Sequence, residues 1–131
     1  MRPAGVIRLC ALGDLLITAL FALPFLAGPV VELLFWLNNL ISHEMPVPEL
    51  LPFHMLFINL MGTLGVVWAL GRVLRPIPML GMIDAWARLW VTGLLIYFLT
   101  QPGVPAIMAL FIATELLGAW AQFWKLRTPE F

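Results

Sequence analysis

The sequence predicts an all-α integral membrane protein, a four-helix bundle with an additional short interfacial helix between spans one and two. Three observations lead to this prediction. The 131 residues are 63% hydrophobic and 11% charged, whereas a soluble domain carries about 25% charged residues. Four apolar stretches are long enough to cross the hydrocarbon core of a bilayer. Outside the third stretch, lysine and arginine are confined to alternate connections.

The composition also excludes several classes of protein and site. The formal net charge is zero, so the chain offers no basic surface of the kind that binds nucleic acid. The single cysteine, Cys10, excludes an internal disulfide and a paired-cysteine redox or zinc motif. No motif requires a cofactor, and the length allows one transmembrane domain over residues 1–131.

The first span is predicted over residues 9–27, after a short basic head. A basic head before an apolar stretch also describes a signal peptide. Against that reading, Asp14 lies inside the run and no small-x-small cleavage site follows it. Gly28-Pro29 is expected to break the chain, because proline removes a backbone donor and crowds the preceding turn.

Residues 30–42 predict a second, shorter helix. Its polar residues fall on about a third of the helical circumference. They are Glu32, Asn38, Asn39 and Ser42. The stretch is too short to cross a bilayer, so an interfacial or re-entrant position is expected. Residues 43–52 are rich in proline and are expected to form a loop.

The second span is predicted over residues 53–71 and contains one polar amide, Asn59. It also carries a row of small residues that allows another helix to approach closely. This row consists of Gly62, Gly65 and Ala69. The connection that follows, residues 72–82, holds Arg72 and Arg75. The third and fourth spans are predicted over 83–100 and 106–124.

The basic residues indicate an orientation, because cytoplasmic connections carry an excess of lysine and arginine. They occur in the N-terminal head, in the connection after span two, and after span four. These residues are Arg2, Arg8, Arg72, Arg75, Lys125 and Arg127. Trp68, Trp120 and Trp124 are expected near the same membrane boundary. We therefore expect both termini in the cytoplasm and a location in the bacterial inner membrane.

Two charges lie early in the third span. Asp84 and Arg88 are four residues apart, so on a helix they share a face and can pair. Asp14 and Glu115 lie at depths comparable to that of Arg88, on two other spans, when depth is counted from the helical rise. Charges at such depth need a partner or a polar cavity. The candidate pocket residues are Asp14, Asn59, Asp84, Arg88, Glu115 and Gln122.

Two interpretations of this polar set stay open. In the first, Arg88 is a structural brace, ion-paired to Asp14 or Glu115, that fixes the register of the helices. In the second, the set lines a polar pocket that opens toward the cytoplasmic leaflet and handles an amphipathic ligand. Three carboxylates against one arginine leave a surplus of acid. That surplus would suit proton transfer or the binding of a cation.

The two histidines form a second polar group with nearby glutamates. His43, Glu44, Glu49 and His54 lie in or beside the proline-rich loop. Histidine and carboxylate side chains can bind zinc or copper, but their spacing matches no metalloprotease or zinc motif. The solvated loop is therefore the preferred interpretation. No metal site is predicted, and His43 and His54 are the weak candidates.

Two stretches of the chain resemble the small bacterial DoxX-like membrane proteins. The first runs from Gly62 to Arg72 and is followed by Pro76 and Leu80-Gly81. The second is the opening Arg8-Leu9-Cys10-Ala11-Leu12-Gly13. The resemblance implies a four-helix protein of this length and a role such as a subunit of a quinone-linked oxidoreductase. The chain is also similar in outline to four-helix sterol-isomerase-like proteins, whose intramembrane carboxylates hold a cationic centre. There Asp14 and Glu115 would be the acids, and Arg88 departs from the pattern.

These observations predict a small membrane protein that is not itself an enzyme. It would be an accessory subunit of a larger membrane complex, or it would bind a lipid-like or quinone-like molecule. The alternatives are a membrane isomerase or lipid-modifying enzyme using Asp14 and Glu115, and a small oligomeric transporter. An enzyme predicts a cavity that reaches Asp14 or Glu115, an accessory subunit predicts a filled core, and a transporter predicts a symmetric oligomer.

Overall fold

The computed structural model describes residues 1–127, and all regular elements in that part are helical. They are α1 (Pro3–Ala22), α2 (Pro24–Ile41), α3 (Pro52–Leu74), α4 (Pro78–Leu99), the 3-10 turn η1 (Ala106–Met108) and α5 (Ala109–Leu126). Five segments, the last counting η1 with α5, are long and apolar enough to cross a membrane. The all-α prediction is therefore confirmed, and the helices are of the membrane-spanning type expected from the composition.

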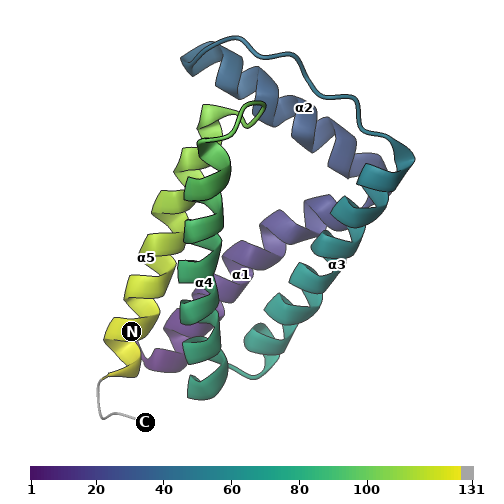
Figure 1. The fold of residues 1–131 in the computed structure, drawn as a ribbon. Coiled ribbons are helices and arrows are strands. Elements are labelled where there is room, and N and C mark those ends of the chain that lie inside the picture. Colours follow the sequence, from purple (N-terminus) through teal and green to yellow (C-terminus); the bar gives the residue numbers. More distant parts are fainter. Residues whose placement is uncertain (128–131) are drawn as a thin grey trace.

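The helices are arranged as two close pairs. α1 packs along α3, and α4 packs along α5, while contacts between the pairs are few. In Figure 1 the α3–α4 connection, the N-terminus and the C-terminal end of α5 lie at one end of the bundle, here named the basic end. α2 runs across the opposite end, near the α4–α5 loop (Figure 1). Arg8 Nε donates to the carbonyl of Val73 at 3.0 Å, which joins the start of α1 to the end of α3.

Helices α1 to α4 each begin at a proline. The preceding residues Arg2, Leu23, Leu51 and Ile77 all have extended backbone angles. Proline disfavours the helical conformation of the residue before it. At the first helical position proline loses no intrahelical hydrogen bond, because that N–H has no partner in any helix. The prolines therefore decide where these four helices start.

The predicted break at Gly28-Pro29 is wrong. The first helix ends at Ala22, Leu23 is extended, and Pro29 lies inside α2. The end of α1 is stabilised from another helix, since Asn59 Nδ2 of α3 donates to the carbonyl of Phe21 at 2.8 Å. That carbonyl is among those a helix end leaves without an intrahelical donor. The sequence shows both prolines, and the structure has the break at Pro24, where this tertiary bond stabilises the end of α1.

The other predicted boundaries shift as well. The helix expected over 30–42 runs from Pro24 to Ile41 and has 18 residues. The argument that it is too short to span therefore no longer holds. The second and third spans, predicted over 53–71 and 83–100, extend to Leu74 and begin at Pro78. The fourth, predicted over 106–124, starts with η1 and ends at Leu126.

The small-residue row of α3 is where α1 packs, as a close approach requires. A Cβ added at Gly62 would lie 2.3 Å from the backbone nitrogen of Ala22, and one at Gly65 would lie 2.4 Å from Thr18 Cγ2. Ala69 is fully buried. The row therefore serves a contact within this chain, between α1 and α3, and brings Asp14 of α1 close to the end of α3.

Candidate functional site

A cluster of ionic side chains joins α1, α3, α4 and α5 toward the basic end. Its centre is Asp84, which is 4% exposed. Asp84 Oδ2 accepts hydrogen bonds from Arg88 Nε and Gln122 Nε2, each at 2.8 Å. Its other oxygen, Oδ1, accepts from Trp68 Nε1 at 2.9 Å. Buried charge of this kind is tolerated only when its hydrogen-bonding capacity is used, and Asp84 meets that condition.

Arg88 spreads its guanidinium over three carboxylates. Its Nε bonds Asp84, its Nη1 donates to Glu115 Oε2 at 3.2 Å, and its Nη2 donates to Asp14 Oδ2. The planar fork of arginine suits such multiple pairing. The expected ion pairs of Arg88 are present and connect α4 to both α1 and α5, while its role as a structural brace stays a prediction. Gly118 of α5 provides the room, because a Cβ there would lie 3.0 Å from Arg88 Cδ.

Arg72 is a member of this cluster that the sequence interpretation missed. It was assigned to a cytoplasmic connection, but it lies in the last turn of α3 and is fully buried. Its Nη2 donates to Asp14 Oδ2 at 2.8 Å, and its Nη1 lies 2.8 Å from Asp84 Oδ2. Its guanidinium also lies over the ring of Trp68, at 5.2 Å from the centroid. The apolar pair Val73-Leu74 after Arg72 was the signal that the helix continues.

The cluster therefore holds three carboxylates and two arginines, not one arginine as the sequence reading assumed. Its formal charge is still negative. Some of its buried polar atoms have no hydrogen-bond partner among the described residues. They include Arg72 Nε and Gln122 Oε1. Arg72 Nη1 meets the distance for an ion pair with Asp84 but not the geometry of a hydrogen bond.

Five of the six predicted pocket residues come together, and one does not. Asp14, Asp84, Arg88, Glu115 and Gln122 share the hydrogen bonds described above. Asn59 belongs instead to the end of α1, where it bonds Phe21. Its polar amide in an apolar span suggested a pocket, but its function here is to satisfy a backbone carbonyl.

The histidines make local contacts. His54 Nδ1 accepts the backbone N–H of Leu51 at 3.2 Å, at the start of α3. The carbonyl of His43 accepts from Asn38 Nδ2 at 3.1 Å, just beyond the end of α2. Within residues 1–127 no group of three or more histidine, cysteine, aspartate or glutamate residues is placed to hold a metal ion. The side chain of His54 thus caps the start of α3, whereas His43 contributes only its backbone carbonyl.

Two cavities adjoin the ionic cluster. The polar one has a volume of about 330 Å³, and its lining includes Asp14, Arg72, Asp84, Arg88 and Glu115. The apolar one has about 510 Å³ and extends toward α2 and the α4–α5 loop, with Glu115 as its single charged lining residue among those described. The cavities share the lining residues Ile17, Thr18, Met61, Val91, Phe111 and Glu115. The two cavities are therefore adjacent, and both are open to the outside of the protein; together they are here named the chamber, apolar near α2 and charged toward the basic end.

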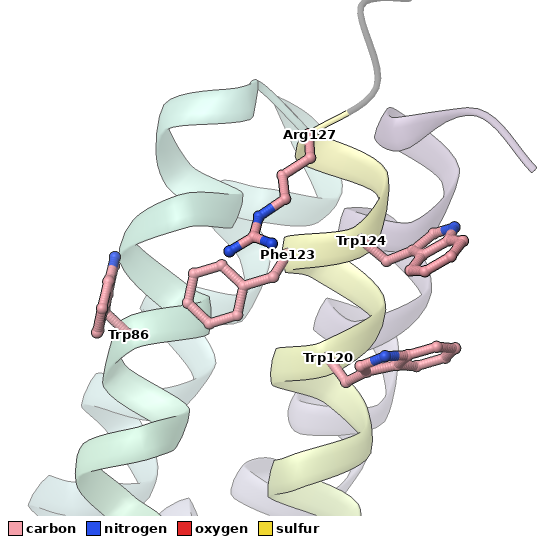
Figure 2. Close-up of a pocket in the computed structure, with 5 residues that line it drawn as sticks. All are labelled: Trp86, Trp120, Phe123, Trp124 and Arg127. Atoms are coloured by element: carbon pink, nitrogen blue, oxygen red, sulfur yellow. The ribbon is translucent and has the colours of Figure 1, made fainter.

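A separate aromatic groove of about 530 Å³ lies on the outside of α4 and α5. Figure 2 shows Trp86 on α4, Phe123 facing it from α5, Trp120 and Trp124 along the other side of α5, and Arg127 at the end of that helix. The rings of Trp86 and Phe123 are 5.3 Å apart and packed edge to face. These exposed aromatic residues near the basic end are typical of a membrane–water interface, and the groove shares no lining residue with the chamber.

Searches with family models, among curated proteins and among solved structures found no match to this chain. The DoxX-like and isomerase-like resemblances therefore stay predictions. What the site can do follows from its own chemistry. It presents carboxylates at the charged end of a largely apolar chamber, an arrangement suited to an amphipathic molecule.

Proposed function

We propose that this protein binds a lipid-like molecule in the chamber between its two helix pairs. The observation that carries the proposal is that the two cavities are adjacent and share lining residues, Glu115 among them. An apolar volume of about 510 Å³ leads to Glu115, where a polar one of about 330 Å³ begins. A chain of methylene groups gains free energy in the apolar part, at about 0.8 kcal/mol for each buried CH₂. The polar head then meets the ionic cluster.

The molecule would enter from the bilayer. α3 and α4 are not packed along each other, and α3 contributes one residue, Met61, to the apolar cavity. Few side chains therefore separate that cavity from the surroundings on this side. An accessory subunit without a ligand would have the filled core described above, so the chamber favours the binding role. A binder can still belong to a larger membrane complex, with the ligand shared between partners.

The first prediction tests occupancy of the chamber. Leu95 lines the apolar cavity, whereas its neighbour Leu94 does not line either part of the chamber. Leu95→Trp should fill the space and abolish copurification of the bound molecule, because closely packed interiors have no room for both. Leu94→Trp, which lies on an exposed part of α4, should leave it unchanged. The measurement is mass spectrometry of lipids extracted from the two purified variants and the parent.

Retention of the same molecule by Leu95→Trp at the parent level would refute this site. Equal loss in both variants would place the molecule on the outer surface of α4. The extraction also identifies the molecule, because lipids bound in the chamber should be enriched over their share of the membrane. The comparison with Leu94→Trp removes the contribution of annular lipid.

We further propose a topology of four crossings, by α1, α3, α4 and α5, in the bacterial inner membrane, with α2 at the outer interface. It is supported by α2 running across one end of the bundle and by the shared end of the N-terminus and α5 (Figure 1). Both termini would then be cytoplasmic, in agreement with the distribution of basic residues.

The second prediction tests that topology. His43→Cys and Arg127→Cys, each made in a Cys10→Ala background, place a thiol beyond α2 and at the end of α5. A membrane-impermeant maleimide added to spheroplasts should label His43→Cys and should label Arg127→Cys only after lysis. Labelling of Arg127→Cys in intact spheroplasts would contradict the orientation. The cysteine-free Cys10→Ala parent is the control for labelling that does not depend on either introduced thiol.

An isomerase is the second candidate, because the chamber reaches both acids that such an enzyme would use. Asp14 and Glu115 each accept a bond from Arg88, and the other oxygen of each has no hydrogen-bond partner within residues 1–127. Incubation of the loaded protein in deuterated water distinguishes the two functions. Incorporation of deuterium at carbon in the recovered molecule would identify proton transfer, whereas its absence supports binding alone.

A further inference from the structure

The atoms that the ionic cluster presents to the chamber are carboxylate oxygens. The side chains of Asp14 and Glu115 are 26% and 19% exposed, whereas those of Arg88, Asp84 and Arg72 are 7%, 5% and 1% exposed. Asp14 receives both arginines on Oδ2, and Glu115 receives Arg88 on Oε2. Neither Oδ1 of Asp14 nor Oε1 of Glu115 has a hydrogen-bond partner among the described residues.

Both arginines also line the polar cavity, but their side chains are less exposed than those of Asp14 and Glu115. Arg88 directs all three nitrogens at acids, and Arg72 pairs with Asp14 and Asp84 and lies over the ring of Trp68. A ligand in the chamber therefore meets hydrogen-bond acceptors before it meets donors. The formal charge of the cluster is also unbalanced by one acid, counting Asp14, Asp84 and Glu115 against Arg72 and Arg88.

From this arrangement we infer that the ligand is a single-headed amphiphile with a protonated amine as its polar group. An ammonium head carries three donors and no acceptor, so it matches the free oxygens of Asp14 and Glu115 and balances the remaining charge. A carboxylate or phosphate head would bring acceptors to acceptors. A quinone head, with carbonyl oxygens, would also lack donors. This inference rests on the proposed binding function and specifies its head group.

The test compares three ligands of equal chain length, an alkyl amine, an alkyl alcohol and an alkyl carboxylic acid, on the full-length protein in detergent. Native mass spectrometry of titrations gives an apparent Kd for each. The amine should bind at least about tenfold more tightly than the alcohol, since a hydrogen bond to a charged group exceeds a neutral one by roughly that factor. The acid should bind most weakly. This comparison uses the unaltered protein and needs no variant to fold.

Glu115→Gln keeps the shape of the side chain and removes its charge. It should weaken amine binding by about tenfold and should change alcohol binding much less. The matched control is Glu44→Gln, which removes the same charge from an exposed position beyond α2. Glu115→Asp keeps the charge and should keep the preference for the amine.

The outcomes separate this inference from the function it rests on. If the alcohol or the acid binds the parent as tightly as the amine, and Leu95→Trp prevents that binding, the chamber binds lipid but the head-group inference is overturned. Equal weakening of all three ligands by Glu115→Gln also overturns it, because Glu115 would then only shape the chamber. If none of the three binds the parent, the proposed function itself fails for single-chain amphiphiles.

Discussion

Arg88→Leu is expected to lower the free energy of unfolding in detergent by about 3–5 kcal/mol at pH 8, the range for removing one partner of a buried ion pair. Arg88 is 6% exposed and bonds Asp14, Asp84 and Glu115. Without it, three acids remain around Arg72 alone. The loss should be smaller at pH 5, because protonation removes their charge and a neutral carboxylic acid is much less costly to bury.

The direction with pH follows from proton binding. In the folded variant, the buried acids that have lost their partner bind protons more strongly than the same acids do in the unfolded chain, where water surrounds them. Acid therefore favours the folded variant relative to its unfolded form, and stability falls as pH rises. The parent, with Arg88 in place, should show a weaker dependence over the same interval.

Two further variants make the Arg88 experiment specific. Arg75→Leu removes an exposed arginine from the α3–α4 connection and should change stability by less than about 0.5 kcal/mol. Arg88→Leu combined with Glu115→Gln should recover part of the loss, because one unpaired acid becomes neutral. Equal stability of Arg88→Leu and the parent at both pH values would mean that the brace does not hold the bundle together.

Gly62→Ala is the second change with a large expected effect. The added Cβ would lie 2.3 Å from the nitrogen of Ala22 and 2.5 Å from the carbonyl carbon of Phe21. Both are backbone atoms, which cannot rotate away as a side chain can. α1 and α3 must separate, at a cost of about 3 kcal/mol, the upper part of the range for overpacking. The separation would also disturb the bond from Asn59 to Phe21.

Gly71→Ala is the matched control, because it lies on the same helix and a Cβ there meets no atom within 4 Å. It should be neutral or slightly stabilising, since alanine favours helix over glycine. Gly65→Ala should fall between the two, because its clash is with the side chain of Thr18. Thermal unfolding in one detergent compares all three. Equal melting temperatures for Gly62→Ala and Gly71→Ala would contradict the close packing of α1 on α3.

Much of the site was visible in the sequence because charge is rare in an apolar segment. Asp14, Asp84, Arg88 and Glu115 each stand out against hydrophobic neighbours, and their depths follow from the helical rise. The spacing of Asp84 and Arg88 predicts their contact without knowledge of the fold. These residues could be assigned to one cluster because few other groups could satisfy them.

Arg72 shows where this reasoning stops. The sequence around an arginine near a predicted loop does not distinguish a side chain that faces water from one that is buried. Its burial depends on α3 continuing to Leu74 and on the approach of Asp14 from α1. Asn59 is the reverse case, since an amide in an apolar span predicts a polar pocket but here satisfies the carbonyl of Phe21. Both assignments depend on a partner distant in the sequence.

The sequence by itself determined the all-helical class, helices apolar enough to cross a membrane and the charges that must be buried together, because these follow from composition, periodicity and the cost of charge in an apolar medium. The tertiary structure decided the break at Pro24, the inclusion of Arg72 and the chamber. The physical reason is common to all three. Each depends on which helices pack together, α1 with α3 and α4 with α5. The small-residue row of α3 predicts a close approach, but it does not determine which helix packs there.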